Sequence, residues 1–424
     1  MVPELLKTNQ ALRCIECAKE YKLDYDSYSC SCGELLEVFF KTPPVTKGLL
    51  ELWSQRRLSS KSVDRSGVWR YREAILDLPE SELVTRGEGN TNLYTSSQLS
   101  SFTGIDHLFL KHEGENPTGS FKDRGMAGAA TLAKMLGAKA VACASTGNTS
   151  ASMASYAALA GIKPFVFLPR GKISLGKLSQ ALAYGAITFQ IEGSFDDALA
   201  LVQKACHELG IYLMNSVNPF RIEGQKAIVI EALENLGWEV PDWIVLPGGN
   251  LGNTSAFGKA LRELKDWGLI SRLPRIAVIQ AQGANPFYQL VDQGRETLEP
   301  MSPETLATAI RIGNPVSWKK ALRVIEESRG VVEQLSEAEI KEAKVAVDGA
   351  GIGAEPASCC SVGGLKKLRQ KGVISKSDSV LTILTGHLLK DPDGTLSIHS
   401  ELVPEPPVLP NRYEDARDLL SQFL

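Results

Sequence analysis

Short apolar runs that alternate with helical patterns fill most of the chain from about residue 90 onward. Among these runs are HLFLKHE, AVACAS, PFVFLP, AITFQI, WIVLPGG and RIAVIQA, each flanked by turn residues. Most are followed by segments of helical period, such as SMASYAALAGI and SFDDALALVQKACHELG. Short hydrophobic strands that alternate with helices are typical of sheets buried on both faces. The sequence therefore predicts an α/β fold with parallel sheets.

The predicted elements divide the 424 residues into four parts. We expect two open, parallel-rich α/β domains: a larger one from residues 46–115 and 225–400, and a smaller one from residues 116–224. Residues 1–45 would form a small β segment that carries cysteines. Residues 401–424 would form a proline-rich arm followed by a short helix.

Charge and composition exclude several kinds of partner. The net charge of −3 and the isoelectric point near 6.1 give no electrostatic reason to expect binding to nucleic acid or to an anionic membrane. The uncharged run from Ala140 to Ile162 is long enough to span a bilayer, but seven of its residues are Ser, Thr or Asn. We interpret it as a buried strand, a turn and a helix. The start, MVPELLKTNQALRCIEC, lacks the pattern of a signal peptide, so we expect a cytoplasmic location with reduced thiols.

Four of the eight cysteines lie in the N-terminal segment, as Cys14-x-x-Cys17 and Cys30-x-Cys32. Their arrangement is similar to that of a zinc ribbon, in which four thiolates surround one zinc ion. The second pair is CxC rather than the usual CxxC, and this spacing strains tetrahedral closure. The alternative is a small β-rich flap with thiols that bind no metal. We favour the flap and expect no metal site.

Polar turns follow four of the predicted strands. GENPTGSFKDRG follows HLFLKHE, STGNTS follows AVACA, GGNLGN follows WIVLP, and TGHLLKD follows VLTIL. In open α/β sheets, ligands collect at the carboxyl ends of the strands. Any one of these loops is accounted for as a tight turn, but four of them favour a shared anion or cofactor pocket.

The GGNLGN turn has the features of a phosphate cradle. Its glycines Gly248, Gly249 and Gly252 let backbone N–H groups approach an anion, and the helix that follows adds its positive end. The turn is neither a Walker A motif nor GxGxxG.

A GxGxxA match occurs at residues 349–354. A dinucleotide fingerprint must follow a strand, but this match follows a helical pattern that begins with a capping box at Ser336 and Glu339. We therefore disfavour a dinucleotide site there.

Lys122 lies in the first of the polar turns, directly after Pro-Thr-Gly-Ser-Phe. A phosphate-bearing cofactor that forms a Schiff base with a lysine accounts for Lys122, the amide-rich STGNTS turn and the phosphate cradle together. A lone SxxK match, Ser174 to Lys177, lacks the companion motifs that a serine acyl-enzyme needs.

The motifs NPTGSFKDRG, STGNTS, GGNLGN and TGHLLKD, in this order, resemble the pyridoxal-phosphate enzymes of the tryptophan-synthase-β type, or fold type II. Within that group the chain is similar to the threonine synthases over roughly residues 40–400. The most specific stretches are NPTGSFKDRG and NPFRIEGQK, residues 218–226. The cysteine-bearing segment is similar to that of the longer threonine synthases, including those of plants. The resemblance also implies a homodimer.

The resemblance assigns roles to individual residues. Lys122 would bind the cofactor covalently and act as the catalytic base. Asn148 would hydrogen-bond the 3-hydroxyl oxygen of the cofactor, and Thr385 would face its pyridine nitrogen. The cofactor phosphate would be held by Gly248, Gly249, Asn250, Leu251, Gly252 and Asn253. The substrate would be held at its carboxylate by Ser145, Thr146 and Thr149, and at its phosphate by Ser216, Arg221 and Asn250.

The reaction that the resemblance implies is the conversion of O-phospho-L-homoserine and water to L-threonine and phosphate, by γ-elimination and β-addition, in the last step of threonine biosynthesis. Two positions depart from the expected pattern. Cys359 and Cys360 stand where small, alanine-like residues are expected, and His387 has no assigned role. We interpret the cysteines as a packing change.

Rival functions share the fold. One is a threonine or serine dehydratase, or a synthase that uses phosphoserine. Another is a catalytically inactive, ligand-binding relative, against which the presence of Lys122, Asn148 and Thr385 argues. Arg221 argues against a dehydratase, whose substrate carries no phosphate. Its alternative role is to cap a helix after Asn218, but a guanidinium near a serine suits a phosphate better.

Overall fold

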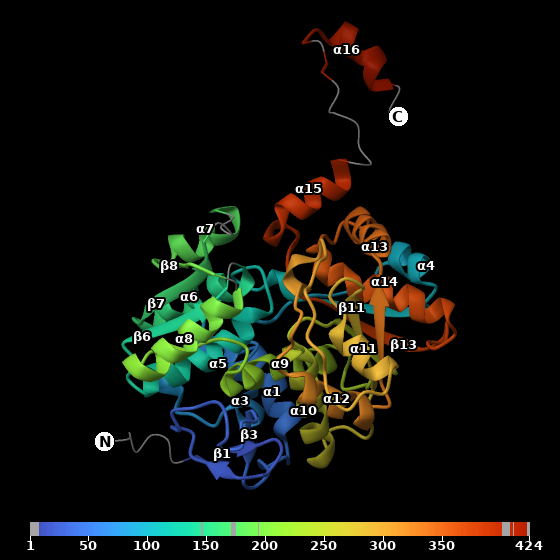
Figure 1. Cartoon of the computed structure of the whole chain (residues 1–424). Coiled ribbons are helices and arrows are strands. Elements are labelled where there is room, and N and C mark those ends of the chain that lie inside the picture. The colour runs from blue at the N-terminus through green and yellow to red at the C-terminus, as the bar shows by residue number, and fades with distance from the viewer. Residues whose placement is uncertain are drawn as a thin grey trace.

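The computed structural model describes residues 8–145, 147–170, 175–193, 195–400, 408–409 and 411–421. These residues form three sheets (Figure 1). The N-terminal sheet is antiparallel, has the order β2-β1-β3, and consists of β1 (Gln10–Cys14), β2 (Glu20–Tyr21) and β3 (Leu36–Phe40). It lies at the bottom of Figure 1, in blue.

The other two sheets are built from parallel strands. The larger has the order β12-β11-β10-β13-β5-β4, and only β4 is antiparallel to its neighbour. Its strands are β4 (Leu93–Tyr94), β5 (His107–His112), β10 (Trp243–Pro247), β11 (Arg275–Ala281), β12 (Val331–Leu335) and β13 (Ser379–Leu384). The smaller has the order β8-β7-β6-β9 and consists of β6 (Ala140–Ala144), β7 (Lys163–Pro169), β8 (Ile187–Ile191) and β9 (Tyr212–Leu213).

Helices connect and cover these strands. The α-helices are α1 (Leu49–Arg57), α2 (Ser62–Arg65), α3 (Arg72–Ile75), α4 (Ser97–Thr103), α5 (Lys122–Met135), α6 (Asn148–Ala160), α7 (Leu175–Ala183), α8 (Phe195–Leu209), α9 (Pro219–Asn235), α10 (Gly252–Asp266), α11 (Pro286–Asp292), α12 (Trp318–Glu327), α13 (Glu337–Gly349), α14 (Pro356–Gln370), α15 (Pro392–Ser400) and α16 (Tyr413–Leu420). The 3₁₀ turns are η2 (Trp69–Tyr71), η3 (Glu80–Glu82), η4 (Glu113–Glu115), η5 (Thr308–Ile310) and η6 (Leu388–Lys390).

The predicted α/β class with parallel-rich sheets is confirmed. All five residues of β6 and of β10 are buried, as expected for central strands covered on both faces. The run from Ala140 to Ile162 forms β6, a turn and α6. No helix in the described part of the chain is long and apolar enough to cross a membrane. The limits of the domains stay a prediction.

The region of the GxGxxA match also has the predicted form. The helix α13 begins with the capping box, because the Ser336 hydroxyl accepts from the Glu339 backbone N–H while the Glu339 carboxylate accepts from the Ser336 backbone N–H. The glycines therefore follow a helix and not a strand, which removes the context that a dinucleotide fingerprint needs.

A buried ion network fixes the start of α5. Arg124, in the first turn of α5, donates to Glu113 at 2.6 Å and to Glu231 on α9 at 2.9 Å. Lys111 on β5 donates to the same Glu231 at 2.7 Å. All four side chains are almost fully buried, so each charge needs its partners. Arg124 therefore braces the helix that Lys122 begins.

Glycines let α5 and α9 approach each other closely. A Cβ atom on Gly224 of α9 would lie 2.1 Å from the Arg124 carbonyl oxygen, and one on Gly128 of α5 would lie 2.6 Å from the Phe220 carbonyl oxygen. Both distances are far below van der Waals contact, so only glycine fits at either position.

Gly224→Ala tests this close packing. The added methyl group must push α9 away from α5, and overpacking of this kind costs about 1–3 kcal/mol. At about 2–4 °C per kcal/mol, the midpoint of thermal unfolding should fall by several degrees. The control is Gly349→Ala, since a Cβ there meets nothing within 4 Å. Equal midpoints for the two variants would contradict the packing account.

Candidate active site

The turn that carries Lys122 lies against the loop at the carboxyl end of β13. The Phe121 N–H donates to the Thr385 carbonyl oxygen at 3.0 Å, and the His387 N–H donates to the Gly119 carbonyl oxygen at 2.9 Å. Two of the polar turns predicted from the sequence therefore run side by side, and Lys122 begins α5 where they meet.

Asp123 holds the shape of this turn. Its carboxylate accepts from the Thr118 N–H at 2.7 Å and from the hydroxyls of Thr118 and Ser152, each at 2.6 Å. Burial raises the pKa of Asp123 to about 6, against the lowering effect of these hydrogen bonds. Because its oxygens are engaged by the turn and by α6, Asp123 acts as a brace for the neighbouring lysine.

The Lys122 amine has the properties of a nucleophile and base. Its side chain is half-buried, and Nζ lies 4.0 Å from the centre of the Phe121 ring. Burial and the nearby Arg221 cation lower the pKa of Lys122 to about 7, while the Glu355 carboxylate acts in the opposite direction. At neutral pH a large fraction of the amine is therefore unprotonated, which is the form that attacks carbonyl carbon and accepts protons.

Asn148 and Glu355 face each other near Lys122. The Asn148 amide, at the first residue of α6, donates to the Glu355 carboxylate at 3.1 and 3.3 Å. Burial raises the pKa of Glu355. A Cβ on Gly386 would lie 2.4 Å from Glu355 Oε1, so the glycine after Thr385 makes room for this carboxylate.

The sequence analysis missed Glu355. The available signal was its place directly before Pro356, because a proline often begins a helix and Glu355 is the N-cap residue of α14. Its proximity to Asn148 depends on how the starts of α14 and α6 come together in the fold, and no local pattern encodes that.

Thr385 is buried, and the partner of its hydroxyl among the described residues is another hydroxyl rather than a carboxylate. Its Oγ1 is 2.8 Å from the Ser358 hydroxyl oxygen, which also accepts from the Gly386 N–H at 2.8 Å.

The residues that depart from the expected pattern have structural places. Cys359 and Cys360 on α14 are fully buried in the apolar core, consistent with the packing interpretation. His387 has a local role, since its Nδ1 accepts from the Leu389 N–H at the start of η6.

The GGNLGN turn joins β10 to α10 and leaves polar groups open at the helix start. Leu251 has a φ of 63°, an uncommon conformation for a leucine, and the helix begins at Gly252. Among the described residues, the buried atoms Asn253 Oδ1 and Thr254 Oγ1 have no hydrogen-bond partner, nor has Gln225 Oε1 on α9. The Thr254 hydroxyl is a free donor, and together with the backbone N–H groups at the start of α10 it fits a bound phosphate.

Arg221, in the first turn of α9, is a buried cation without a counterion among the described residues. Its Nη1 donates to the Met214 carbonyl oxygen at 3.0 Å, and its Nε has no partner. Burial lowers the pKa of Arg221 to about 10. An isolated buried charge is costly, so this arrangement fits an anionic ligand.

Asn215, which the sequence analysis did not identify, joins the segments that carry Ser216 and Ser145. Asn215 accepts from the Ala144 N–H at 3.0 Å and donates to the Ala144 carbonyl oxygen at 3.2 Å. It thereby joins the turn before α9 to the end of β6. Ser145, Ser216 and Thr149 are half-buried. Nothing in the local sequence distinguishes Asn215 from other turn residues.

One predicted site residue, Thr146, lies outside the described part of the chain, as does Ser174 of the dismissed SxxK match. Asn250 is half-buried and makes no hydrogen bond to Ser216 or Arg221 in the described residues, so its place at the substrate phosphate stays a prediction. The roles of the other predicted residues also stay predictions.

Comparison with known proteins identifies the family. Residues 84–386 match the model of the pyridoxal-phosphate dependent enzymes. The chain is 46% identical over 391 residues to a threonine synthase of Methanocaldococcus jannaschii, across 92% of this chain and 95% of the relative. The chain belongs to the threonine synthases. Identity to a threonine synthase of Methanosarcina acetivorans is 48% over 394 residues, across 92% of this chain and 94% of that one.

Solved structures support the fold. The crystal structure of threonine synthase from Escherichia coli matches with a TM-score of 0.71 at 19% identity, across 98% of this chain and 100% of that one. The structure of maize serine racemase matches with a TM-score of 0.63 at 22% identity, across 74% of this chain and 93% of that one. At such identities the likeness concerns the fold alone.

The cofactor of this family is pyridoxal phosphate, and the site fits it. The chain offers an amine with a lowered pKa, a glycine-rich helix start with an unpaired threonine hydroxyl, and a second threonine hydroxyl at a strand end. These are the groups that a phosphorylated pyridine aldehyde needs.

Two charge changes test the electrostatics of Lys122. Arg221→Met removes a cation and should raise the pKa of Lys122, whereas Glu355→Gln removes an anion and should lower it. Since only the neutral amine reacts, the pH at half-maximal acylation of Lys122 in cofactor-free protein should rise in the first variant and fall in the second.

Mass spectrometry of the labelled peptides measures both shifts, and Lys134 at the other end of α5 serves as the internal control. Shifts in the same direction, or none, would contradict the assigned causes.

Proposed function

We propose that the chain converts O-phospho-L-homoserine and water to L-threonine and phosphate. The observation that carries the proposal is the buried Arg221 guanidinium, which has no carboxylate partner in the described residues and lies close enough to Lys122 to lower its pKa. The threonine synthases to which the chain is similar supply the reaction class.

In this proposal Lys122 performs the proton transfers. Pyridoxal phosphate, when bound, supplies the electron sink that cleavage of a C–H bond next to an amino group requires. With a pKa of about 7, the Lys122 amine accepts a proton from the α-carbon and is charged enough to return one. Asp123 and Arg124 keep the amine in place through their own buried contacts.

Arg221 and Ser216 hold the substrate phosphate. A guanidinium presents donors in a planar fork that matches phosphate oxygens, and its charge stabilises the phosphate as it leaves the γ-carbon. The phosphate of the cofactor is assigned to the GGNLGN turn instead, where the α10 start and the unpaired Thr254 hydroxyl lie. The two anions therefore have separate sites.

The start of α6 holds the substrate carboxylate. Ser145 precedes this helix and Thr149 is its second residue, so both lie near its positive end, where backbone N–H groups are free to donate. The Asn148 amide, which donates to Glu355 in this structure, is the donor assigned to the 3-hydroxyl oxygen of the cofactor.

The homodimer and the cytoplasmic location expected from the sequence belong to the same proposal.

The fold does not decide between this function and a dehydratase. The structure of the processed form of threonine deaminase isoform 2 from Solanum lycopersicum matches with a TM-score of 0.63 at 16% identity, across 86% of this chain and 96% of that one. The buried cation at Arg221 favours a phosphorylated substrate, because a hydroxy amino acid would leave the guanidinium without an anion.

The choice of substrate is the first test. We expect release of phosphate and formation of threonine from O-phospho-L-homoserine, at a kcat/KM well above that for L-threonine, L-serine or O-phospho-L-serine. Product formation by mass spectrometry and phosphate release are measured together. Faster conversion of threonine or serine to an oxo acid would establish the dehydratase instead, and faster turnover of phosphoserine would establish the other synthase.

Arg221→Ala tests the phosphate assignment. A hydrogen bond to a charged group contributes about 1.5–3 kcal/mol, so KM for O-phospho-L-homoserine should rise by about 10- to 150-fold. The visible absorbance of the bound cofactor should persist, since its phosphate lies elsewhere. Arg272→Ala, at an arginine 47% exposed on its side chain, is the matched control and should leave KM unchanged. An unchanged KM in Arg221→Ala would overturn the assignment.

A further inference from the structure

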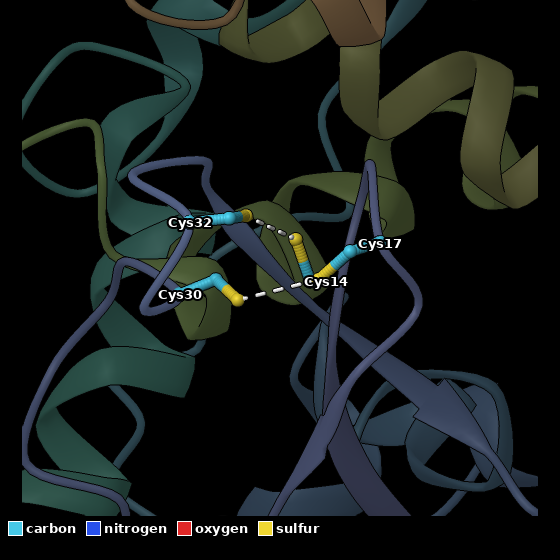
Figure 2. Close-up of side chains that lie close together, drawn as sticks. All are labelled: Cys14, Cys17, Cys30 and Cys32. Atoms are coloured by element: carbon cyan, nitrogen blue, oxygen red, sulfur yellow. Dashed lines mark hydrogen bonds between the residues drawn. The ribbon is translucent and has the colours of Figure 1, made fainter.

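Figure 2 shows four cysteine side chains of the N-terminal segment converging on one point. Their sulfur atoms all lie within 4.8 Å of one another. Cys14 Sγ is 3.5 Å from Cys32 Sγ, and Cys17 Sγ is 3.5 Å from Cys30 Sγ. When four thiolates bind a zinc ion tetrahedrally at a Zn–S distance of about 2.3 Å, neighbouring sulfur atoms lie about 3.8 Å apart. The thiols therefore already have nearly the spacing that zinc requires.

The geometry removes the objection raised by the short Cys30-x-Cys32 spacing. Each 3.5 Å contact joins one sulfur of the Cys14–Cys17 turn to one sulfur of the Cys30–Cys32 turn. The two cysteines of the CxC pair therefore each face a cysteine of the other turn and do not have to face each other. In both turns the residue after the second cysteine has a positive φ, 59° at Ala18 and 94° at Gly33. These reversals let the two turns face each other.

Polar donors surround the sulfurs. The Glu16 N–H donates to Cys14 Sγ at 3.4 Å, and the Tyr21 hydroxyl lies 3.1 Å from Cys30 Sγ. Donors of this kind stabilise the thiolate ligands of metal sites. Cys14 and Cys30 are buried, whereas Cys17 and Cys32 are exposed. One side of the cluster is thus anchored in protein and the other is open for metal entry.

Disulfide bonds account for the arrangement less well. Sulfur atoms in a disulfide lie about 2.05 Å apart, and both close contacts here are 3.5 Å. Two disulfide bonds would hold the sulfurs in two separate pairs. They would not require all four sulfurs to lie around one centre, as they do here.

We propose that Cys14, Cys17, Cys30 and Cys32 bind one zinc ion as four thiolates in a closed structural site. The sequence analysis favoured a segment without metal on the basis of spacing alone. The three-stranded N-terminal sheet is small, and a metal tie supplies the stability that such a sheet lacks on its own.

The zinc site also supports the start of α9. Tyr28, two residues before Cys30, accepts a hydrogen bond from the Asn218 amide at 3.0 Å. Asn218 is the N-cap of α9, since its Oδ1 accepts from the Phe220 N–H at 3.0 Å. Arg221 follows one helical turn later. A zinc ion that fixes the cysteine turns would therefore also stabilise the N-cap of the helix that carries Arg221.

A second set of contacts ties the same segment to α12. The Lys320 ammonium donates to the Leu36 carbonyl oxygen at 3.0 Å, and the Arg323 guanidinium donates to the Ile15 carbonyl oxygen at 2.9 Å. Ile15 lies between the first two cysteines, so the turn that would bind zinc is also the turn that α12 holds.

Metal analysis of the purified full-length protein tests the site. After dialysis, mass spectrometry should find about one zinc per chain, as expected for a four-thiolate site. The variants Cys17→Ser and Cys32→Ser change exposed thiols and should reduce zinc to background. Cys206→Ser, at a buried cysteine outside the cluster, is the control and should keep the metal. Zinc retained in the double variant Cys17→Ser and Cys32→Ser would overturn the ligand assignment.

Two measurements keep the test decisive if the variants fold poorly. Wild-type protein in which cobalt replaces zinc should show the visible bands of tetrahedral cobalt bound by thiolates. Thiol titration of wild-type protein denatured without reductant should count all eight cysteines once zinc is chelated. Four missing thiols would establish two disulfides, and iron in place of zinc in the purified protein would overturn the choice of metal.

Discussion

The buried carboxylate of Glu231 on α9 is the interaction on which the rest of the site depends. It binds Arg124 of α5 at 2.9 Å and Lys111 of β5 at 2.7 Å, and these cations hold its pKa well below the usual range of a glutamate even though burial acts to raise it. Charges buried this deeply tolerate little displacement, because each loses its compensation when a partner moves. Lys122 and Arg221 lie on the helices that this carboxylate joins, so their separation is set by it.

The same geometry couples the two cations of the site. Arg221 lowers the pKa of Lys122, and Arg221 lacks a counterion in the described residues. In the proposed reaction a phosphate dianion beside Arg221 compensates its charge, and the pKa of Lys122 then rises. Binding of the phosphorylated substrate therefore makes the lysine a stronger base at the moment it must accept a proton. An uncharged substrate would leave the amine weakly basic.

Local patterns in the sequence were enough to predict most of the strands, the parallel sheets and the polar turns at strand ends, but not the edge strands β4 and β12. They identified Lys122 and the GGNLGN turn because a turn directly after a buried strand is a local feature. Glu355 and Asn215 were missed because their partners, Asn148 and Ala144, are distant in sequence and meet them only through packing. The convergence of the four cysteine sulfurs was not foreseen for the same reason, since spacing along the chain does not reveal that two turns face each other.

In the proposed reaction, Lys122 and Arg221 remove phosphate from the substrate by elimination, and water then adds to the β-carbon. Turnover of O-phospho-L-homoserine in water labelled with oxygen-18 distinguishes this course from hydrolysis. The label should enter the hydroxyl of threonine, while the released phosphate should stay unlabelled. Label in the phosphate, with homoserine as the product, would show hydrolysis at phosphorus and rule out the elimination.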